Sequence, residues 1–592
     1  MEQAPTGASR GALVVLVALV VLSPWPFGSA HPLVTQAIAI IALLTSLVVF
    51  TSTPRSVALP PRVVPPLVGL WLLVALQLVL LPRGLHRLLA PGSAAVWYPS
   101  DPVAAAVLGG GAHPISLDPE ATARWLAFTT GLVALALLAA PALRERRATF
   151  RAAIAIVIGA IAVTVYALFA RLAFGDKLYG FLAVPTIAPF GPFVSKNHFA
   201  GYVEIAACLA VGLATGLADE ARRGPERLSW LESSHSGRVV FAWGAAAALV
   251  LVVPLSLSRG GVVSLAAGLV VFAALRVWVR RSGRTSPRTL AFAVSALAIV
   301  AIAVALVLPP ETTARLRTLG GITTDSASSY RIAIARDSLR LAATSPIVGS
   351  GFGAYEDAIP RFKTAAGDLR VEHAENDYLE LLVEGGLAAG LLAGFLAFAA
   401  VTGALRRIRD EPHRLGCGLR CGALAGVAAL LVHSAFDFNL RIPSNALLFV
   451  LLAAFALAPA GRLTNDAAPE PGARRRTRLL GAAVLATATV LAFATPWAGR
   501  RIKNAPFERA ASGKNAGLRW QSLERDTIAH LRRRPADATA WVGLAWLRQP
   551  RSQAEAAALA SWGVSLDPQL EALRRAADDV AGRPTQIQPR RP

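Results

Sequence analysis

Charged residues and sulfur are both scarce in this sequence. Only 16% of its 592 residues are charged, and it contains three cysteines and one methionine. So little charge, beside a hydrophobic content of 54%, excludes an ordinary soluble domain. The cysteines lie in apolar segments, which supports neither a disulfide framework nor a thiolate zinc site: Cys208, Cys417 and Cys421. We therefore expect an all-α, polytopic membrane protein.

Acidic residues are scarce as well, 36 against 59 lysines and arginines, which gives a formal net charge of +23. A charge of this size is typical of nucleic-acid-binding proteins. Here, however, the arginines form short clusters between apolar runs, as the positive-inside rule predicts for the cytoplasmic loops of membrane proteins. We predict that the lipid bilayer is the partner of this charge, and that nucleic acid is not.

Apolar runs of about 20 residues mark the expected membrane spans. Thirteen segments qualify: 11–28, 32–52, 63–82, 124–143, 150–174, 198–217, 238–257, 260–280, 289–309, 377–405, 416–434, 443–461 and 478–498. With a cytoplasmic N-terminus, the arginine-rich loops all fall inside: 144–151, 221–227, 280–288, 406–414 and 474–478. The first span could instead be a signal peptide with its cleavage site at residues 28–30.

The long hydrophilic connections then fall on the outer face, and long loops are where function concentrates. They are residues 83–123, 175–197 and 310–375, and the tail after residue 499. The 310–375 loop is balanced in charge, which predicts a folded cap. Within it, residues 328–346 alternate isoleucine and leucine with arginine in the pattern of an amphipathic helix on the membrane surface.

This pattern predicts four regions along the chain. N-terminal transmembrane helices occupy residues 1–189, and a transmembrane core that includes the 310–375 loop occupies residues 190–462. A final transmembrane helix occupies residues 463–499, and a soluble helical tail follows at 500–592.

The tail has a repeat-like spacing. Pro535 and Pro568 lie 33 residues apart, close to the period of about 34 residues in tetratricopeptide repeats. Trp541, Leu544 and Ala545 also resemble the signature positions of such a repeat. A small helical appendage of another kind is the alternative. We place the tail on the outer side of the membrane.

The first chemical motif is "LSLSRGGVVSL" at residues 255–265. Ser258 can cap the helix that follows, while Gly260 and Gly261 leave its first backbone N–H groups open to a ligand. A helix N-terminus beside Arg259 is suited to bind an anion such as pyrophosphate. In the alternative reading, Arg259 only extends toward lipid head groups.

The second motif is "VEHAENDYLELLVEGG" at residues 371–386. His373, Asp377, Glu380 and Glu384 are spaced as one stripe of a helix, and Asn376 lies beside them. Carboxylates placed in this way can orient an imidazole as a general base, so we take His373, Asp377 and Glu384 as catalytic candidates. A metal site and a simple dipole-stabilising helix start are the alternatives. One histidine gives no convincing ligand set, so we predict no metal.

The third motif pairs "FGPFVSKNHFAGY" (190–202) with "LVHSAFDFNLRIPSN" (431–445), both at outer helix ends. Lys196, Asn197 and His198 could bind phosphate or sugar hydroxyls. Asp437 and Arg441 could form an i,i+4 pair, for which a structural role is the simpler explanation.

Taken in order, these motifs resemble the O-antigen ligase and polymerase family of bacterial envelope enzymes. The resemblance runs over residues 190–460 and includes "RIAIARDSLRLAATSPIVGSGFGAY" (331–355). It implies a metal-independent, cofactor-free glycosyltransferase of the bacterial inner membrane. By resemblance, Arg259 and Arg331 bind the donor pyrophosphate and His373 lies by the acceptor hydroxyl.

The resemblance also implies the partners. The donor is a glycan on undecaprenyl pyrophosphate, and the acceptor, at the periplasmic face, is a lipid, a polysaccharide or a protein. The tail could recruit a chain-length regulator. A transporter of polysaccharide or lipid-linked oligosaccharide is the alternative function, although such proteins usually show internal repeats and polar residues near the membrane midplane.

Overall fold

The computed structural model describes residues 7–52, 62–175, 177–183, 189–221, 234–280, 326–365, 367–458, 471–495 and 516–582. In this part of the chain the fold is all-α, and the only strands are the short antiparallel pair β1 (Lys177–Leu178) and β2 (Leu182–Ala183). The expectation of an all-α membrane protein is therefore confirmed.

In the part of the chain that the structure describes, eight helices are long and apolar enough to cross a membrane. Four further predicted spans form shorter apolar helices: Gly7–Leu22, Val64–Leu78, Pro443–Leu457 and Gly481–Ala494. The predicted span at 289–309 lies outside the described residues. The chain is thus a multi-pass membrane protein with eight candidate spans of full length among the described residues, and the total of thirteen spans stays a prediction.

The chain divides into two compact units. Unit 1 comprises the described residues of 1–65, 127–322 and 395–494, and unit 2 those of 66–126, 323–394 and 495–592. Helices α7 (Pro119–Ala139) and α16 (Asp377–Asp410) begin in unit 2 and end in unit 1.

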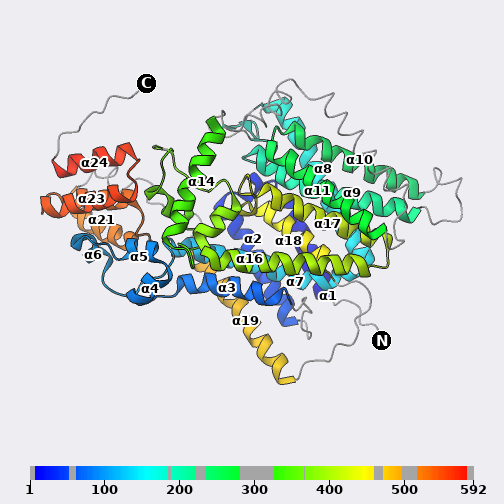
Figure 1. Cartoon of the computed structure of the whole chain (residues 1–592), viewed down its shortest axis with the longest axis horizontal. Helices are drawn as coiled ribbons and strands as arrows, with labels where there is room; N and C mark the ends of the chain where they lie inside the picture. The colour runs from blue at the N-terminus through cyan, green and yellow to red at the C-terminus, as the bar shows by residue number, and fades with distance from the viewer. Residues whose placement is uncertain are drawn as a thin grey trace. The chain divides into compact units, whose positions relative to one another are not determined.

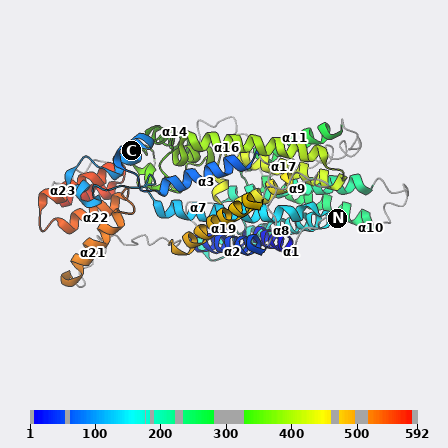
Figure 2. The same ribbon diagram turned by 90° about the horizontal axis from the view of Figure 1, so that it is seen from below.

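Unit 1 is a helical bundle. Its other elements are α1 (Gly7–Leu22), η1 (Phe27–Ser29), α2 (Pro32–Ser52), η2 (Ala140–Arg144), α8 (Arg146–Phe174), α9 (Lys196–Ala221), α10 (Ser234–Leu255), α11 (Arg259–Arg280), α17 (Arg414–His433), η5 (Asn439–Arg441), α18 (Pro443–Leu457) and α19 (Pro471–Ala494). Helix α9 lies at its centre, with α10, α11 and α17 packed around it (Figures 1 and 2). Almost the whole of α9 is buried.

Glycines allow α9 and α17 to pack backbone to backbone. A Cβ atom on Gly418 of α17 would lie 2.8 Å from Cα of Gly216 on α9, and one on Gly212 would lie 2.9 Å from Cα of Gly422. Both distances are too short for carbon atoms, so only glycine fits. Small residues at four-residue spacing are the usual way in which membrane helices approach closely, because the bilayer supplies little hydrophobic drive between helices.

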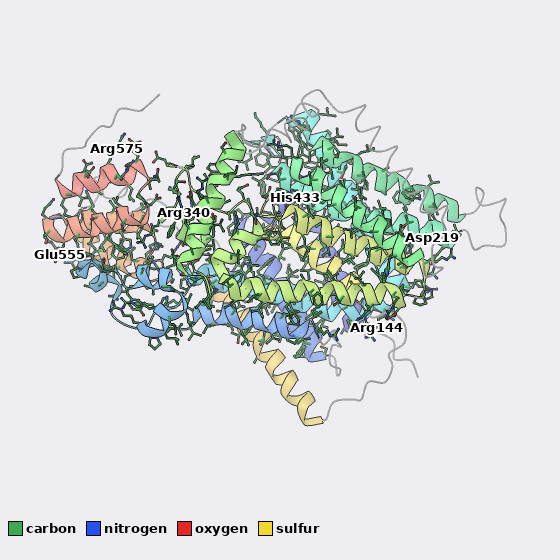
Figure 3. All side chains as sticks on the ribbon, in the orientation of Figure 1. Arg144, Asp219, Arg340, His433, Glu555 and Arg575 are labelled. Atoms are coloured by element: carbon green, nitrogen blue, oxygen red, sulfur yellow. The ribbon has the colours of Figure 1, made fainter. Side chains whose placement is uncertain are left out.

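Buried charge pairs lie at both ends of this core. Arg276 of α11 pairs with Asp219 near the C-terminal end of α9. At the other end Glu204 of α9 pairs with His433, the last residue of α17. Figure 3 shows Asp219, near the end of α9, and His433, at the end of α17, on opposite sides of this part of the bundle.

Unit 2 contains the polar connections and the tail. Its elements are α3 (Val64–Leu78), α4 (Arg83–Leu89), α5 (Pro91–Trp97), α6 (Pro102–Leu108), α14 (Ser326–Thr344), α15 (Tyr355–Ala358), η4 (Ile359–Arg361), α21 (Ala516–Leu531), α22 (Ala538–Arg548), α23 (Gln553–Leu566) and α24 (Glu571–Ala581). The amphipathic helix predicted at 328–346 is α14. The helical nature of the tail is also confirmed, while its identity as a tetratricopeptide repeat stays a prediction.

The tail packs on the loops that precede it in unit 2. The Arg534 guanidinium binds the Asp357 carboxylate at 2.7 Å and lies 3.4 Å from Asp118. Nζ of Lys363 lies 3.1 Å from the Asp567 carboxylate. Burial raises the pKa of Asp357, and the Arg534 charge opposes that shift. The tail thus belongs to the same folded unit as the connections at 83–118 and 326–375, and its side of the membrane stays a prediction.

Candidate functional site

The first turn of α11 begins at Arg259, directly after a capping serine. Ser258 caps it, because its hydroxyl accepts a hydrogen bond from N–H of Gly261 at 3.2 Å. Leu257 reaches this turn with a φ of 59°, a left-handed conformation that is unusual for a residue other than glycine. Arg259 and Gly260 follow, half-buried. The predicted cap is confirmed. The left-handed turn at Leu257, just before the cap, sets where the helix begins, with Arg259 as its first residue.

The first turn of α9 meets that of α11. A Cβ on Gly261 would lie 2.6 Å from Cβ of Ala200, so the two helix starts touch. Lys196 and Asn197 occupy the first positions of α9, half-buried, and Ser195 accepts from N–H of Asn197 at 3.2 Å. Four predicted donor-site residues therefore gather at one end of unit 1, together with the predicted polar residue Asn197: Lys196, Arg259, Gly260 and Gly261.

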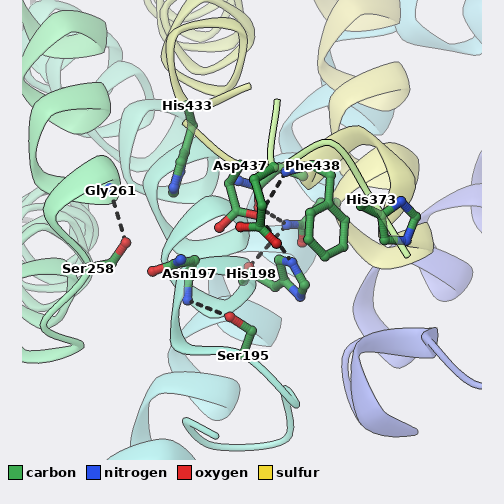
Figure 4. A network of polar contacts seen from close by, with 12 residues as sticks. Ser195, Asn197, His198, Ser258, Gly261, His373, His433, Asp437 and Phe438 are labelled. Carbon is green, nitrogen blue, oxygen red and sulfur yellow. Dashed lines mark hydrogen bonds and ion pairs between the residues drawn. The ribbon is translucent and has the colours of Figure 1, made fainter. Parts of the chain in front are cut away.

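A buried polar network continues from α9 to the chain beyond α17 (Figure 4). Nε2 of His198 lies 3.4 Å from Asp437, and its ring packs edge-on against Phe438 with 4.8 Å between centroids. Asn445 donates to the carbonyl of His198 at 3.0 Å and to Asn439 at 2.8 Å. These contacts hold the predicted "HSAFDFNL" segment against the start of α9.

Two residues that the sequence did not single out lie at the same place. Nδ1 of His433 lies 3.1 Å from both carboxylate oxygens of Glu204. The opposite nitrogen, Nε2, lies 3.0 Å from where a Cβ of Gly260 would be. His433 stands in a quoted motif, but nothing in the spacing connects it with Glu204, 229 residues earlier.

In unit 2, His373 has a carboxylate partner. Nδ1 of His373 lies 3.0 Å from Oε1 of Glu380, and the other carboxylate oxygen, Oε2, accepts from N–H of Ala374 at 3.1 Å. The guanidinium of Arg331 on α14 lies 3.0 Å from Glu375, whose φ is 54°. Arg331 is thereby held at the loop that carries His373.

The predicted stripe of four residues on one helix is wrong in one respect. Helix α16 begins at Asp377, so His373 lies in the preceding loop and not on the helix. The physical reason is the cap. The side chain of Asn376 accepts from N–H of Tyr378 at 2.9 Å and of Leu379 at 3.1 Å, which starts the helix after it. Asp377 is buried in the first turn.

Glu384 lies at a break in α16 rather than on a continuous helix that enters lipid. Gly386 has a φ of 64° and a ψ of −166°, which interrupts the helix. The Glu384 carboxylate accepts from N–H of Gly353 at 2.8 Å. The buried amide of Gln77 on α3 donates to the carbonyl of Glu384 at 2.8 Å and to that of Val348 at 2.7 Å. The polar groups exposed by the break are thus paired within unit 2.

Among the described residues, no group of three or more His, Cys, Asp or Glu side chains is placed to hold a metal ion.

Comparison with protein families gives one match. The family described as O-antigen ligase matches residues 244–394. The chain carries a domain of the O-antigen ligase family. This ligase domain contains Arg259, Arg331, His373, Glu380 and Glu384. A comparison with curated proteins gives no match.

Proposed function

We propose that the protein transfers a glycan from undecaprenyl pyrophosphate to an acceptor hydroxyl at the periplasmic face of the bacterial inner membrane. The observation that carries the proposal is the meeting of two helix starts in unit 1, those of α9 and α11, which bring Lys196 and Arg259 to one end of the bundle. The match of the ligase domain over Arg259, Arg331 and His373 supports it.

The donor side of the reaction needs positive charge. Helix N-termini present unpaired N–H groups and a partial positive charge, which together favour phosphate oxygens. Arg259 and Lys196 each add a full positive charge. Arg331 is the second arginine that we assign to the donor pyrophosphate. When the anomeric carbon–oxygen bond breaks, these groups stabilise the departing pyrophosphate, which is the larger part of the expected rate enhancement.

The acceptor side needs a base. A carboxylate only accepts hydrogen bonds, so Nδ1 of His373 donates to Glu380 and the lone pair lies on Nε2. Nε2 takes the hydroxyl proton while the acceptor oxygen bonds to the anomeric carbon. A positioned base contributes about 10²–10⁴-fold. In this scheme Asp377 and Glu384 support His373 through the fold of α16, the helix that follows it, and Asn376 caps the start of that helix. Asn197 lies in the first turn of α9 beside Lys196.

One observation favours a second candidate, a transporter of lipid-linked glycans. Transporters commonly bind their substrates at discontinuous helices, and α16 is broken at Gly386. The two functions differ in their product, because a transporter makes no new glycosidic bond.

Substitution of the arginines tests the proposal. Arg259→Ala and Arg331→Ala should insert in the membrane at normal levels and lose glycan transfer. Lysine should restore little, because it cannot bind phosphate through two parallel donors. Transfer at the wild-type rate by both alanine variants would exclude the donor-site assignment. Analysis of the polysaccharide of a deletion strain distinguishes a polymerase, which sets chain length, from a ligase, which sets attachment.

A further inference from the structure

Glu204 and His433 form a buried hydrogen-bonded pair of ionisable side chains in unit 1. The glutamate is 0% exposed and the histidine 1% exposed. They come from α9 and α17, at the end of the bundle where the buried Asp437 and Asn439 also lie. Both carboxylate oxygens lie 3.1 Å from Nδ1, so the imidazole is held on one edge at a fixed orientation.

The stability of the bundle does not account for this pair. Removing two charged groups from water costs several kcal/mol per ion, and the attraction between them often fails to offset that cost. Ionisable residues inside membrane proteins are rare for the same reason and usually serve function. An apolar pair of similar volume would hold α9 and α17 together at least as well.

The opposite edge of the imidazole faces the start of α11. A Cβ on Gly260 would lie 3.0 Å from Nε2 and 3.1 Å from Cδ2 of His433, so the ring packs directly on the backbone of this turn. Figure 4 shows the ring of His433 beside Ser258 and Gly261, the residues that cap the turn. The residue next to Gly260 is Arg259.

We propose that Glu204 and His433 are positioning residues for the pyrophosphate group of the donor. The pair fixes the first turn of α11, and with it the direction of Arg259 and of the backbone N–H groups at this helix start that bind phosphate oxygens. This inference rests on the proposed function of the α11 start as the donor site. Neither residue needs to touch the donor.

An apolar replacement of the pair separates positioning from stability. Glu204→Met/His433→Leu removes both ionisable groups at similar volume, and the purified protein should unfold at the same temperature as wild type or higher. Its affinity for farnesyl pyrophosphate, a soluble pyrophosphate probe, should fall about tenfold or more, because small misplacements of binding groups carry large penalties. The KM for the glycan donor should rise with it.

Single substitutions sharpen the test. Glu204→Gln keeps an oxygen that accepts from Nδ1 and should retain most of the probe affinity, whereas Glu204→Met should not. Gly260→Ala places a methyl group against His433 and should also weaken the probe. Gly268→Ala is the matched control, since its Cβ would lie 2.8 Å from Cβ of Ala429 on α17, two turns further along α11. It should lower the unfolding temperature without changing the probe affinity.

The possible failures are distinguishable. If wild-type protein does not bind farnesyl pyrophosphate, the proposed donor site itself is wrong, and this inference falls with it. If wild type binds the probe and Glu204→Met/His433→Leu binds it equally well, only the positioning role is wrong. If Glu204→Gln binds as weakly as Glu204→Met, the pair acts through its charge, which also overturns the positioning role.

Discussion

Nδ1 of His373 lies 3.0 Å from Oε1 of Glu380, and the carboxylate is 1% exposed whereas the imidazole is 30% exposed. A buried carboxylate behind a partly exposed imidazole is the arrangement of a general base and the group that orients it. Glu380, rather than Asp377 or Glu384, is therefore the carboxylate that acts on His373.

Glu380→Gln should lower kcat by about 10–100-fold, because an amide holds the ring without stabilising its protonated form. Glu384→Gln should lower turnover less and should reduce the unfolding temperature, since Glu384 binds backbone N–H groups of the 353–355 loop. The measurement is kcat beside thermal unfolding for both variants. The opposite order of effects would return the orienting role to Glu384.

Chelation should leave transfer by the purified, detergent-solubilised protein intact. The charge of the leaving pyrophosphate is met by Arg259, Arg331 and two helix N-termini in this account, so Mg²⁺ or Mn²⁺ is not required. The assay compares rates before and after treatment with EDTA. Loss of transfer that is restored by added metal would show that a cation takes part in the reaction.

Gly418→Ala should destabilise unit 1 by about 1–3 kcal/mol, because the new methyl group meets the backbone of α9 and cannot be accommodated by a side-chain movement. Gly244→Ala on α10 is the control, since its Cβ would meet no atom within 4 Å. Thermal unfolding in detergent measures both. Equal unfolding temperatures for the two variants would show that α9 and α17 are not packed backbone to backbone.

Stability of unit 2 should fall in mild acid because of His86. Burial, and then the charge of His113, lower the pKa of His86 from 6.5 to about 4. Between these pH values the unfolded chain binds a proton at His86 that the folded chain does not bind. The contribution of His86 to the free energy of unfolding is therefore fully present above about pH 6.5 and declines toward pH 4. The loss should be on the order of 2 kcal/mol by pH 5.

The variant His86→Gln supplies the comparison for that pH dependence. It removes the titrating group and keeps a partner for Ser93, whose Oγ lies 3.2 Å from Nε2 of His86. Its unfolding temperature should change less between about pH 7.5 and about pH 5, an interval that spans the unfolded pKa. Parallel curves for wild type and variant would assign the acid sensitivity to other groups.

Local patterns predicted much of the fold. Apolar runs located the spans, the spacing of isoleucine, leucine and arginine located α14, and Ser258 before two glycines located the start of α11. Each of these signals lies within a few residues of the feature that it predicts. The break in α16 was missed, because a pair of glycines inside an apolar run is compatible with a continuous membrane helix as well.

Long-range pairing accounts for the remaining differences. Glu204 and His433 lie 229 residues apart, and Gln77 lies 307 residues from Glu384. No periodicity within one helix can reveal such partners. His373 was identified as a candidate, but its position in the loop before α16 was not predicted. The cap at Asn376 and the left-handed turn at Glu375 end the helical spacing before His373 is reached. The roles of the side chains at this site depend on backbone turns that the amino-acid composition does not predict.

The most direct test of the central claim measures donor binding and glycan transfer in the same preparation of His373→Ala. A base acts only in the chemical step, so the variant should bind the undecaprenyl pyrophosphate donor with wild-type affinity while transfer falls by about 10²–10⁴-fold. Arg259→Ala, measured in parallel, should lose donor binding itself. If His373→Ala lost donor binding together with transfer, or transferred at the wild-type rate, the assignment of His373 as the base would be contradicted.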